Sequence, residues 1–265
     1  MLADASWVTL ISIAAIALAA GFVHSAIGFG FGIVAIAAVP LVMDIKSAHI
    51  VVSLASVPMI MMTSLAYRRG IHWPSLRVAV LGAVLFLPLG VLSFEYAPLD
   101  WLVRGTGLAI LAMVLMGLRK QSTGSNRGAN MRACFGAGAV SGFLAGAVSI
   151  AGPPVAAFAL RQQWPQERFK AFVTQCLLAI AVFKAVMLLA RDLVTAESAG
   201  YVLVAAPVAI LGVQLGVVAS RRIPAARFKR IVAIALILVA CQMLWRGSPS
   251  VDSAGQQDPI AVDRR

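Results

Sequence analysis

Few residues in this sequence could do chemistry, and two of them are basic side chains inside long apolar runs. His24 lies in a run over residues 5–43, and Lys184 lies in a run over residues 170–190. Ionisable groups are costly inside a membrane, where they usually pair, relay protons or contact a substrate. His24 can therefore make an interhelical hydrogen bond, bind an anion or relay a coupling proton. Lys184 lies six residues before its run ends, so it either extends to the interface or faces a substrate.

Two segments rich in glycine or proline interrupt the longest apolar runs. Glycine there either permits close helix packing or lets the helix unwind, which exposes backbone N–H groups with partial positive charge that can bind an anion. The proline pair favours unwinding, because proline is tolerated at a helix start and breaks an interior. The predicted anion-binding residues of these segments are Gly28, Gly30, Gly32, Ser149, Gly152, Pro153 and Pro154.

Hydroxyl and amide side chains near these segments could donate hydrogen bonds to anion oxygens, although each can equally join two helices. Besides Ser149 they are Ser25, Ser53, Ser56, Thr174 and Gln175. His49 and His72 lie near run ends, where an interfacial position is expected.

The elements that must position these residues are membrane helices. Hydrophobic residues make up 61% of the 265 residues and charged residues 12%, half of the roughly 25% in soluble domains. A bilayer core requires about 20 helical residues per crossing. The sequence therefore predicts an all-α, multi-pass integral membrane protein, with residues 1–265 as a single membrane domain. About eight apolar runs are present, at 5–43, 47–67, 77–94, 99–118, 133–160, 170–190, 198–219 and 231–246.

Loop charge favours one arrangement of these runs. If every run crosses once, the two sides carry similar numbers of Lys and Arg. If both interrupted runs enter and leave on the same side, 15 Lys and Arg share one face and four lie on the other. The positive-inside rule prefers the second arrangement and predicts that the basic loops are cytoplasmic. These loops are residues 68–77, 119–132, 161–170 and 219–230.

The two interrupted runs also resemble each other, which predicts a duplicated chain. Residues 21–28 align with residues 142–149, and three further apolar runs follow each copy. The repeats are predicted over about 1–120 and 133–246, with a linker at 119–132 and a polar tail at 247–265. In the favoured topology they are inverted, and each opens with a broken or re-entrant helix, as in many carriers that work by alternating access.

The interrupted segments carry a resemblance to a known family. Residues 21–32 read Gly-Phe-Val-His-Ser-Ala-Ile-Gly-Phe-Gly-Phe-Gly, and residues 142–154 read Gly-Phe-Leu-Ala-Gly-Ala-Val-Ser-Ile-Ala-Gly-Pro-Pro. This pair resembles the duplicated glycine-rich signature of the TauE/SafE family of sulfite and organosulfonate exporters. The resemblance extends over nearly the whole chain and implies transport of small sulfur-containing or related organic anions across a bacterial inner membrane.

The residues and the resemblance together predict a secondary carrier, most simply an exporter, of small anions in an inner or plasma membrane. Its expected partners are the anion, membrane lipids and a coupling ion such as H⁺, with no nucleic acid, metal or other cofactor. No Walker motif is present, and no Asp or Glu lies at mid-run to support catalysis or metal binding, so no enzyme activity is expected. A carrier of another small solute and a non-transporting membrane scaffold remain the alternatives.

Overall fold

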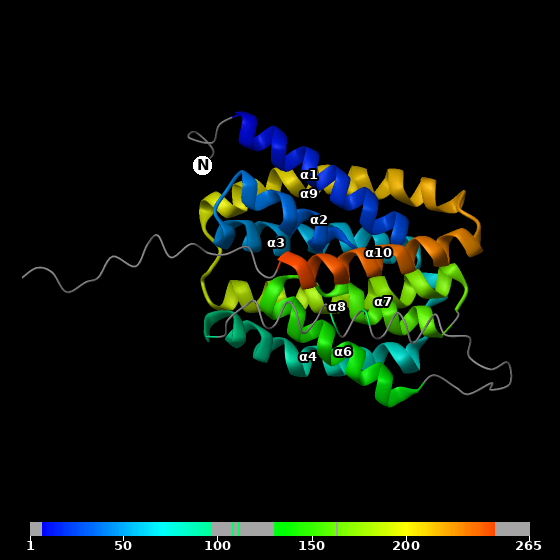
Figure 1. Cartoon of the computed structure of the whole chain (residues 1–265). Helices are drawn as coiled ribbons and strands as arrows, with labels where there is room; N and C mark the ends of the chain where they lie inside the picture. Colours follow the sequence, from blue (N-terminus) through cyan, green and yellow to red (C-terminus); the bar gives the residue numbers. More distant parts are fainter. Residues whose placement is uncertain (1–6, 97–107, 109–110, 112–129, 163, 247–265) are drawn as a thin grey trace, which may run out of the picture.

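The computed structural model describes residues 7–96, 108, 111, 130–162 and 164–246 as a bundle of helices, without a strand in these ranges (Figure 1). The remaining residues, which include run 99–118 almost entirely, most of the linker and the tail, lie outside the described part. The helices before the linker are α1 (Trp7–Ile27), α2 (Phe31–Ala38), the 3-10 helix η1 (Val39–Leu41), α3 (Ile45–Ala66), the 3-10 helix η2 (Arg68–Gly70) and α4 (Trp73–Tyr96). Those after it are α6 (Met131–Val148), α7 (Gly152–Arg161), α8 (Gln166–Ala190), α9 (Ala196–Arg221) and α10 (Ala225–Arg246).

Five of these helices are long and apolar enough to cross a membrane, which agrees with the predicted all-helical membrane protein. They are Trp7–Ile27, Ser47–Ala66, Trp73–Ser93, Gln166–Ala190 and Ala196–Arg221. Many large apolar side chains of these helices are exposed, as Leu85 on α4 and Leu203 on α9 are. Such side chains suit a surface that faces lipid rather than water.

Local capping sets several helix starts. Asp44 accepts a hydrogen bond from the Ser47 backbone N–H at the start of α3. Asn130 accepts from two backbone N–H groups at the start of α6. Thr195 and Ser198 form a capping box at the start of α9. These side chains satisfy N–H groups that have no partner within the helix.

Two pairs of helices pack closely and run parallel. In the pair α4 and α6, Gly138 lies against Ala79 and Gly142 lies against Ala83, so close that an added side chain would collide with the backbone carbonyl opposite. The residue numbers rise together in both helices, which makes the pair parallel. Small residues permit this approach of backbones in membrane helices.

The second pair, α1 and α9, has the same construction. Leu18 of α1 lies against Gly212 of α9, and Phe22, one turn later, lies against Gly216, so the residue numbers again rise together and this pair is also parallel. Ser25 also donates a hydrogen bond to the Val213 carbonyl across this interface, at 2.9 Å. In both pairs, the first long helix on one side of the linker packs against the fourth helix on the other side.

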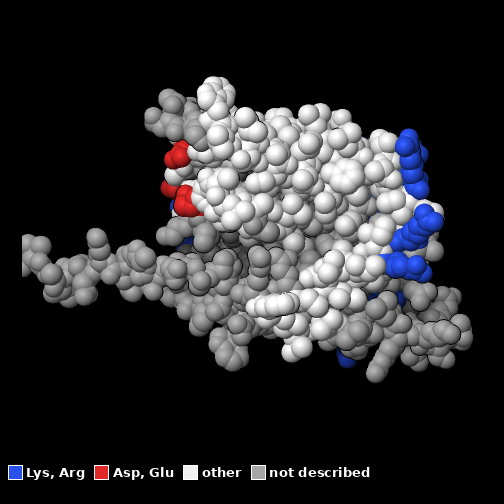
Figure 2. Space-filling model, turned by 45° about the horizontal axis from the view of Figure 1, so that its top comes forward, with Lys and Arg blue, Asp and Glu red and all other residues white. Residues whose placement is uncertain are grey.

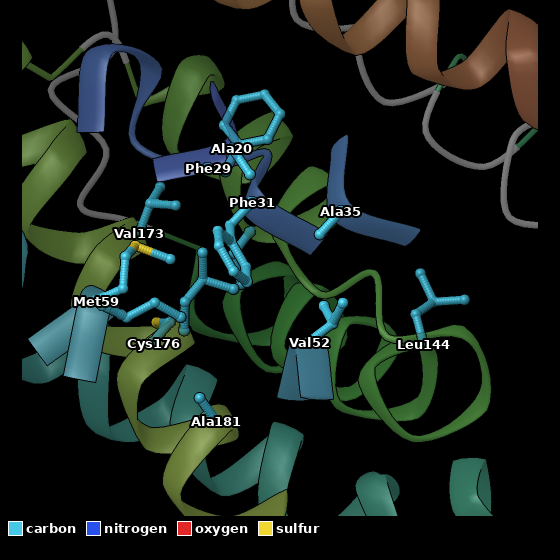
Figure 3. Close-up of a cluster of buried hydrophobic side chains, with 14 of the residues drawn as sticks. Ala20, Phe29, Phe31, Ala35, Val52, Met59, Leu144, Val173, Cys176 and Ala181 are labelled. Carbon is cyan, nitrogen blue, oxygen red and sulfur yellow. The ribbon is translucent and has the colours of Figure 1, made fainter. Parts of the chain in front are cut away.

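Helices α3 and α8 lie between these pairs and carry much of the core. The aromatic side chains of Phe29 and Phe31 lie in this core among residues of α3 and α8 that include Met59 and Cys176 (Figure 3). Phe29 and Phe31 flank the interruption between α1 and α2, so the core packs directly against it.

The two ends of the bundle differ in charge. On the visible face, Lys and Arg gather at one end, and Asp and Glu gather at the other (Figure 2). The connections α3–α4, α7–α8 and α9–α10 meet at the first end, which we call the basic-loop end. There the Tyr67 hydroxyl lies 3.0 Å from the Ser220 hydroxyl, and Gln166 donates to the Ser220 carbonyl at 3.2 Å. The connections α2–α3 and α8–α9 lie at the opposite end (Figure 1).

Candidate anion site

The structure interrupts the helices at both glycine-rich segments and brings the two interruptions into contact. Between α1 and α2, Gly28 and Gly30 have φ angles of 104° and 114°, in a region that favours glycine. Between α6 and α7, Ser149 has a φ of 56°. A side chain at Gly32 would collide with the Ser149 carbonyl oxygen, and one at Gly152 would lie 2.7 Å from the Phe29 Cβ atom.

A cavity of about 70 Å³ lies where these interruptions meet. A cavity needs roughly 10–15 Å³ to hold one water molecule, so this one has room for a small polyatomic ion or a few waters. It is lined by residues of both interruptions and of α1, α3, α6 and α8. Its polar and glycine lining residues are His24, Gly30, Gly32, Ser53, Ser56, Ser149, Gly152 and Lys184.

Lys184 turns inward to this cavity rather than outward to the interface. Its side chain is 5% exposed, and Nζ donates to the Ala145 carbonyl at 2.8 Å and to the Ser149 hydroxyl at 2.5 Å. An ammonium group carries three N–H donors. Because the described residues take up two of them, one donor is left for a ligand.

His24 supplies a second polar group that lacks a complete set of partners. Its side chain is 1% exposed, and Nε2 has no hydrogen-bond partner among the described residues. Buried polar atoms without partners are rare in native structures, and a ligand is one explanation for them. A protonated Nε2 at this place could donate to an anion in the cavity.

Backbone N–H groups at two helix starts also line the cavity. Helix α2 begins beside it with Phe31, Gly32 and Ile33, whose N–H groups have no partner within the helix. Helix α7 begins beside it with Gly152, but the following residues, Pro153 and Pro154, have no N–H. The first interruption therefore offers more backbone donors than the second.

The two α3 serines in the lining cannot donate to an anion as they stand. Ser53 donates its hydroxyl proton to the His49 carbonyl at 2.6 Å, and Ser56 donates to the Ser53 carbonyl at 2.7 Å. A hydroxyl has one proton to donate, so both groups present only acceptor lone pairs to the cavity. The donors to an anion are therefore Lys184, His24 and the backbone.

The other predicted site residues do not line the cavity. Ser25 is occupied at the interface with α9, and Gly28 lies beside Lys170 and Phe169. Pro153 and Pro154 are buried inside α7. Thr174 donates to the Lys170 carbonyl at 2.7 Å, and Gln175 donates to the Ser64 carbonyl at 3.4 Å. Ser25 and Gln175 therefore join neighbouring helices in this conformation, whereas Thr174 bonds within α8.

Two further basic residues contact the interrupted segments. His49 is half-buried near the start of α3, so its interfacial position stays a prediction, whereas Lys170, expected in a basic loop, is buried. The ring of His49, at the start of α3, lies with Nδ1 2.9 Å from the Ser149 hydroxyl, behind the cavity. Lys170 is fully buried, and Nζ donates to the Ser25 carbonyl at 3.0 Å and to the Tyr67 hydroxyl at 3.3 Å. Burial raises the pKa of Tyr67, which keeps this hydroxyl protonated.

Comparison with known proteins gives one family. The model of a family described as "Sulfite exporter TauE/SafE" matches residues 13–243, which includes both interruptions and every residue that lines the cavity. No curated protein and no solved structure matches the chain.

Proposed function

The chain belongs to the TauE/SafE family of sulfite exporters, a membrane transporter family, and from this premise we propose that it is a secondary carrier of small anions such as sulfite and sulfonates. The cavity at the meeting point of the two interruptions is the proposed substrate site. Its membrane is an inner or plasma membrane, with the basic-loop end in the cytoplasm, as the positive-inside rule favours.

The balance of charge in the cavity carries this proposal. Among the described residues, Lys184 and His24 line it, and no Asp or Glu does. A buried ammonium group without a carboxylate partner is costly, and an entering anion would supply the missing charge. Oxygen atoms of a sulfite or sulfonate could accept from Lys184, from His24 and from the start of α2, as anions do at helix N-termini.

The proposed transport mechanism is alternating access by two inverted repeats. The parallel pairs α1 with α9 and α6 with α4 support it, because each pair joins the first helix of one half to the fourth α-helix of the other half, so the two pairs correspond to each other. Two halves built in this way can exchange conformations, so that the cavity opens to one end and then to the other. The interruptions would then act as re-entrant or broken helices at the centre of the membrane.

Anion flux from proteoliposomes tests the proposal. Wild-type protein should release sulfite or a sulfonate with saturable kinetics, and the His24→Ala and Lys184→Ala variants should lose most of this flux while they still insert. The Gly136→Ala variant is the matched control, since a Cβ atom there would meet nothing within 4 Å. Wild-type protein that inserts correctly and moves neither anion would refute the anion carrier. A carrier of another small solute or a non-transporting scaffold would then be favoured.

A further inference from the structure

The Ser149 hydroxyl connects the cavity to a histidine behind it. It accepts a hydrogen bond from Lys184 Nζ at 2.5 Å, and it lies 2.9 Å from His49 Nδ1 and 3.3 Å from His49 Nε2. An ammonium group can only donate, so Ser149 accepts from Lys184. The single proton of Ser149 is then available for His49. The three groups form a hydrogen-bonded chain from Lys184 through Ser149 to His49, in which Ser149 can donate when the facing ring nitrogen of His49 is unprotonated.

The position of His49 leads this chain away from the cavity and toward the opposite end of the bundle. His49 is absent from the cavity lining and is only partly buried. It lies in the second turn of α3, five residues after the exposed helix cap Asp44. Helix α3 starts at the opposite end (Figure 1), and His49 lies one turn nearer to that start than the cavity-lining residue Ser53.

We propose that Lys184, Ser149 and His49 form a proton relay that couples anion movement to proton movement. The proposal rests on the anion carrier proposed above. In the relay, Lys184 gives one proton to Ser149 Oγ as the hydroxyl proton of Ser149 passes to a ring nitrogen of His49. The resulting imidazolium releases its proton to water, and Lys184 is left neutral. Hydrogen-bonded chains that contain histidine serve this purpose in membrane pumps and transporters.

The relay links the charge of Lys184 to the occupancy of the cavity. Protonated Lys184 attracts the anion, and neutral Lys184 does not, so one proton and one anion enter or leave together. Among the described residues, His24 of α1 is the other titratable group that lines the cavity, and none of them bonds to its Nε2 atom. Asp44 is the nearest carboxylate along α3, at the water-exposed end of the relay.

The structure contains a matched control for His49. His72, at the basic-loop end, places Nδ1 2.9 Å from the Ser75 hydroxyl, the same contact that His49 makes with Ser149. No lysine among the described residues donates to the Ser75 hydroxyl, so this pair does not reach the cavity. The variants His49→Gln and His72→Gln each keep a side chain that can hydrogen-bond the serine but cannot carry the proton.

Transport of methanesulfonate by proteoliposomes tests the relay, because the charge of this anion does not change near neutral pH. Two quantities are measured for each protein with the membrane potential clamped. The first is the rate at which labelled anion exchanges for unlabelled anion without a pH gradient. The second is the concentration ratio of the anion that an imposed pH gradient produces across the membrane. For one proton per anion, wild-type and His72→Gln proteins should accumulate the anion on the alkaline side, by about tenfold per unit of pH. The His49→Gln variant should keep exchange and lose accumulation.

The outcomes separate the relay from the carrier itself. Three outcomes would overturn the relay and leave the carrier intact. Wild-type protein could exchange the anion without accumulating it, it could accumulate the anion on the acidic side, or the His49→Gln variant could accumulate as much anion as wild type. A wild-type protein that exchanges neither methanesulfonate nor sulfite would overturn the carrier and the relay together. Equal loss of accumulation in His49→Gln and His72→Gln would also overturn the relay, because the effect would not depend on contact with Ser149.

Discussion

Lys170 and Lys184 lie on the same helix, and each donates a hydrogen bond to a carbonyl in the last turn of a different interrupted helix. Lys170 Nζ reaches the Ser25 carbonyl of α1 at 3.0 Å, and Lys184 Nζ reaches the Ala145 carbonyl of α6 at 2.8 Å. The lysines are fourteen residues apart, or about 21 Å along α8. Helix C-termini carry partial negative charge, so both cations stabilise the ends that they cap. Helix α8 thereby connects the two interruptions.

The two lysines should affect transport differently, because only Lys184 lines the cavity. The Lys184→Met variant should raise the KM for the anion about tenfold or more, since a hydrogen bond to a charged group contributes about 1.5–3 kcal/mol. The Lys170→Met variant should lower the maximal rate several-fold and leave KM within about twofold, because Lys170 positions the end of α1 without contacting the anion. Initial rates over a range of anion concentrations separate these effects.

The Lys170→Arg variant is the control for this comparison. Arginine keeps the positive charge beside the Ser25 carbonyl and the rings of Tyr67 and Phe228, which lie 5.0 Å and 5.2 Å from Lys170 Nζ. It should restore part of the rate that methionine loses. A raised KM in Lys170→Met would instead indicate that this residue contacts the substrate.

Replacement of His24 should weaken anion binding and stabilise the protein. The buried Nε2 atom of His24 has no partner among the residues that the structure describes, and such an atom costs about 1–3 kcal/mol. In His24→Leu this cost disappears, and one donor to the anion disappears with it. We therefore expect a higher thermal unfolding temperature in detergent together with a higher KM in proteoliposomes. A lower unfolding temperature with unchanged KM would mean that His24 only supports the helix packing.

Much of this arrangement could be predicted from local sequence. The helix interruptions fall within the segments that contain Gly28 and Ser149, because positive φ angles and proline leave local signals. His24 and Lys184 were predicted from their rarity inside apolar runs, and both line the cavity. Thr174 is predicted either to donate to the anion or to join two helices, and its hydroxyl instead donates to the preceding turn of its own helix, as threonine in a helix often does.

The contacts that the sequence does not predict depend on tertiary structure. His49 and Ser149 are one hundred residues apart, and no local pattern around either of them indicates that they meet. The apolar run begins only at residue 170, so hydropathy places Lys170 at the end of the basic loop 161–170. In the structure α8 already begins at Gln166, four residues earlier, and contains Lys170. Pro165 followed by Glu167 is a helix-start signal that would have placed Lys170 inside the helix.

Labelling of single cysteines should determine which end of the bundle faces the cytoplasm. Arg222 at the basic-loop end and Glu197 at the opposite end are both exposed. In a Cys241→Ser background, with Cys134 and Cys176 buried, a membrane-impermeant maleimide should label Glu197→Cys in intact cells. It should label Arg222→Cys only after the cells are lysed, because the basic end is predicted to be cytoplasmic. The reverse pattern would invert the proposed topology.

The contact between the two interruptions should tolerate no added methyl group, whereas a glycine near the start of α6 should tolerate one. In Gly32→Ala the new Cβ atom would collide with the Ser149 carbonyl oxygen, a backbone atom that cannot rotate away. The two interruptions would have to separate, so we expect loss of most anion flux and a destabilisation of about 1–3 kcal/mol. In Gly136→Ala the added Cβ meets nothing within 4 Å, and alanine favours the helix by about 0.5–1 kcal/mol. Flux and thermal unfolding of both variants test this, and normal flux in Gly32→Ala would show that transport does not require the interruptions to touch.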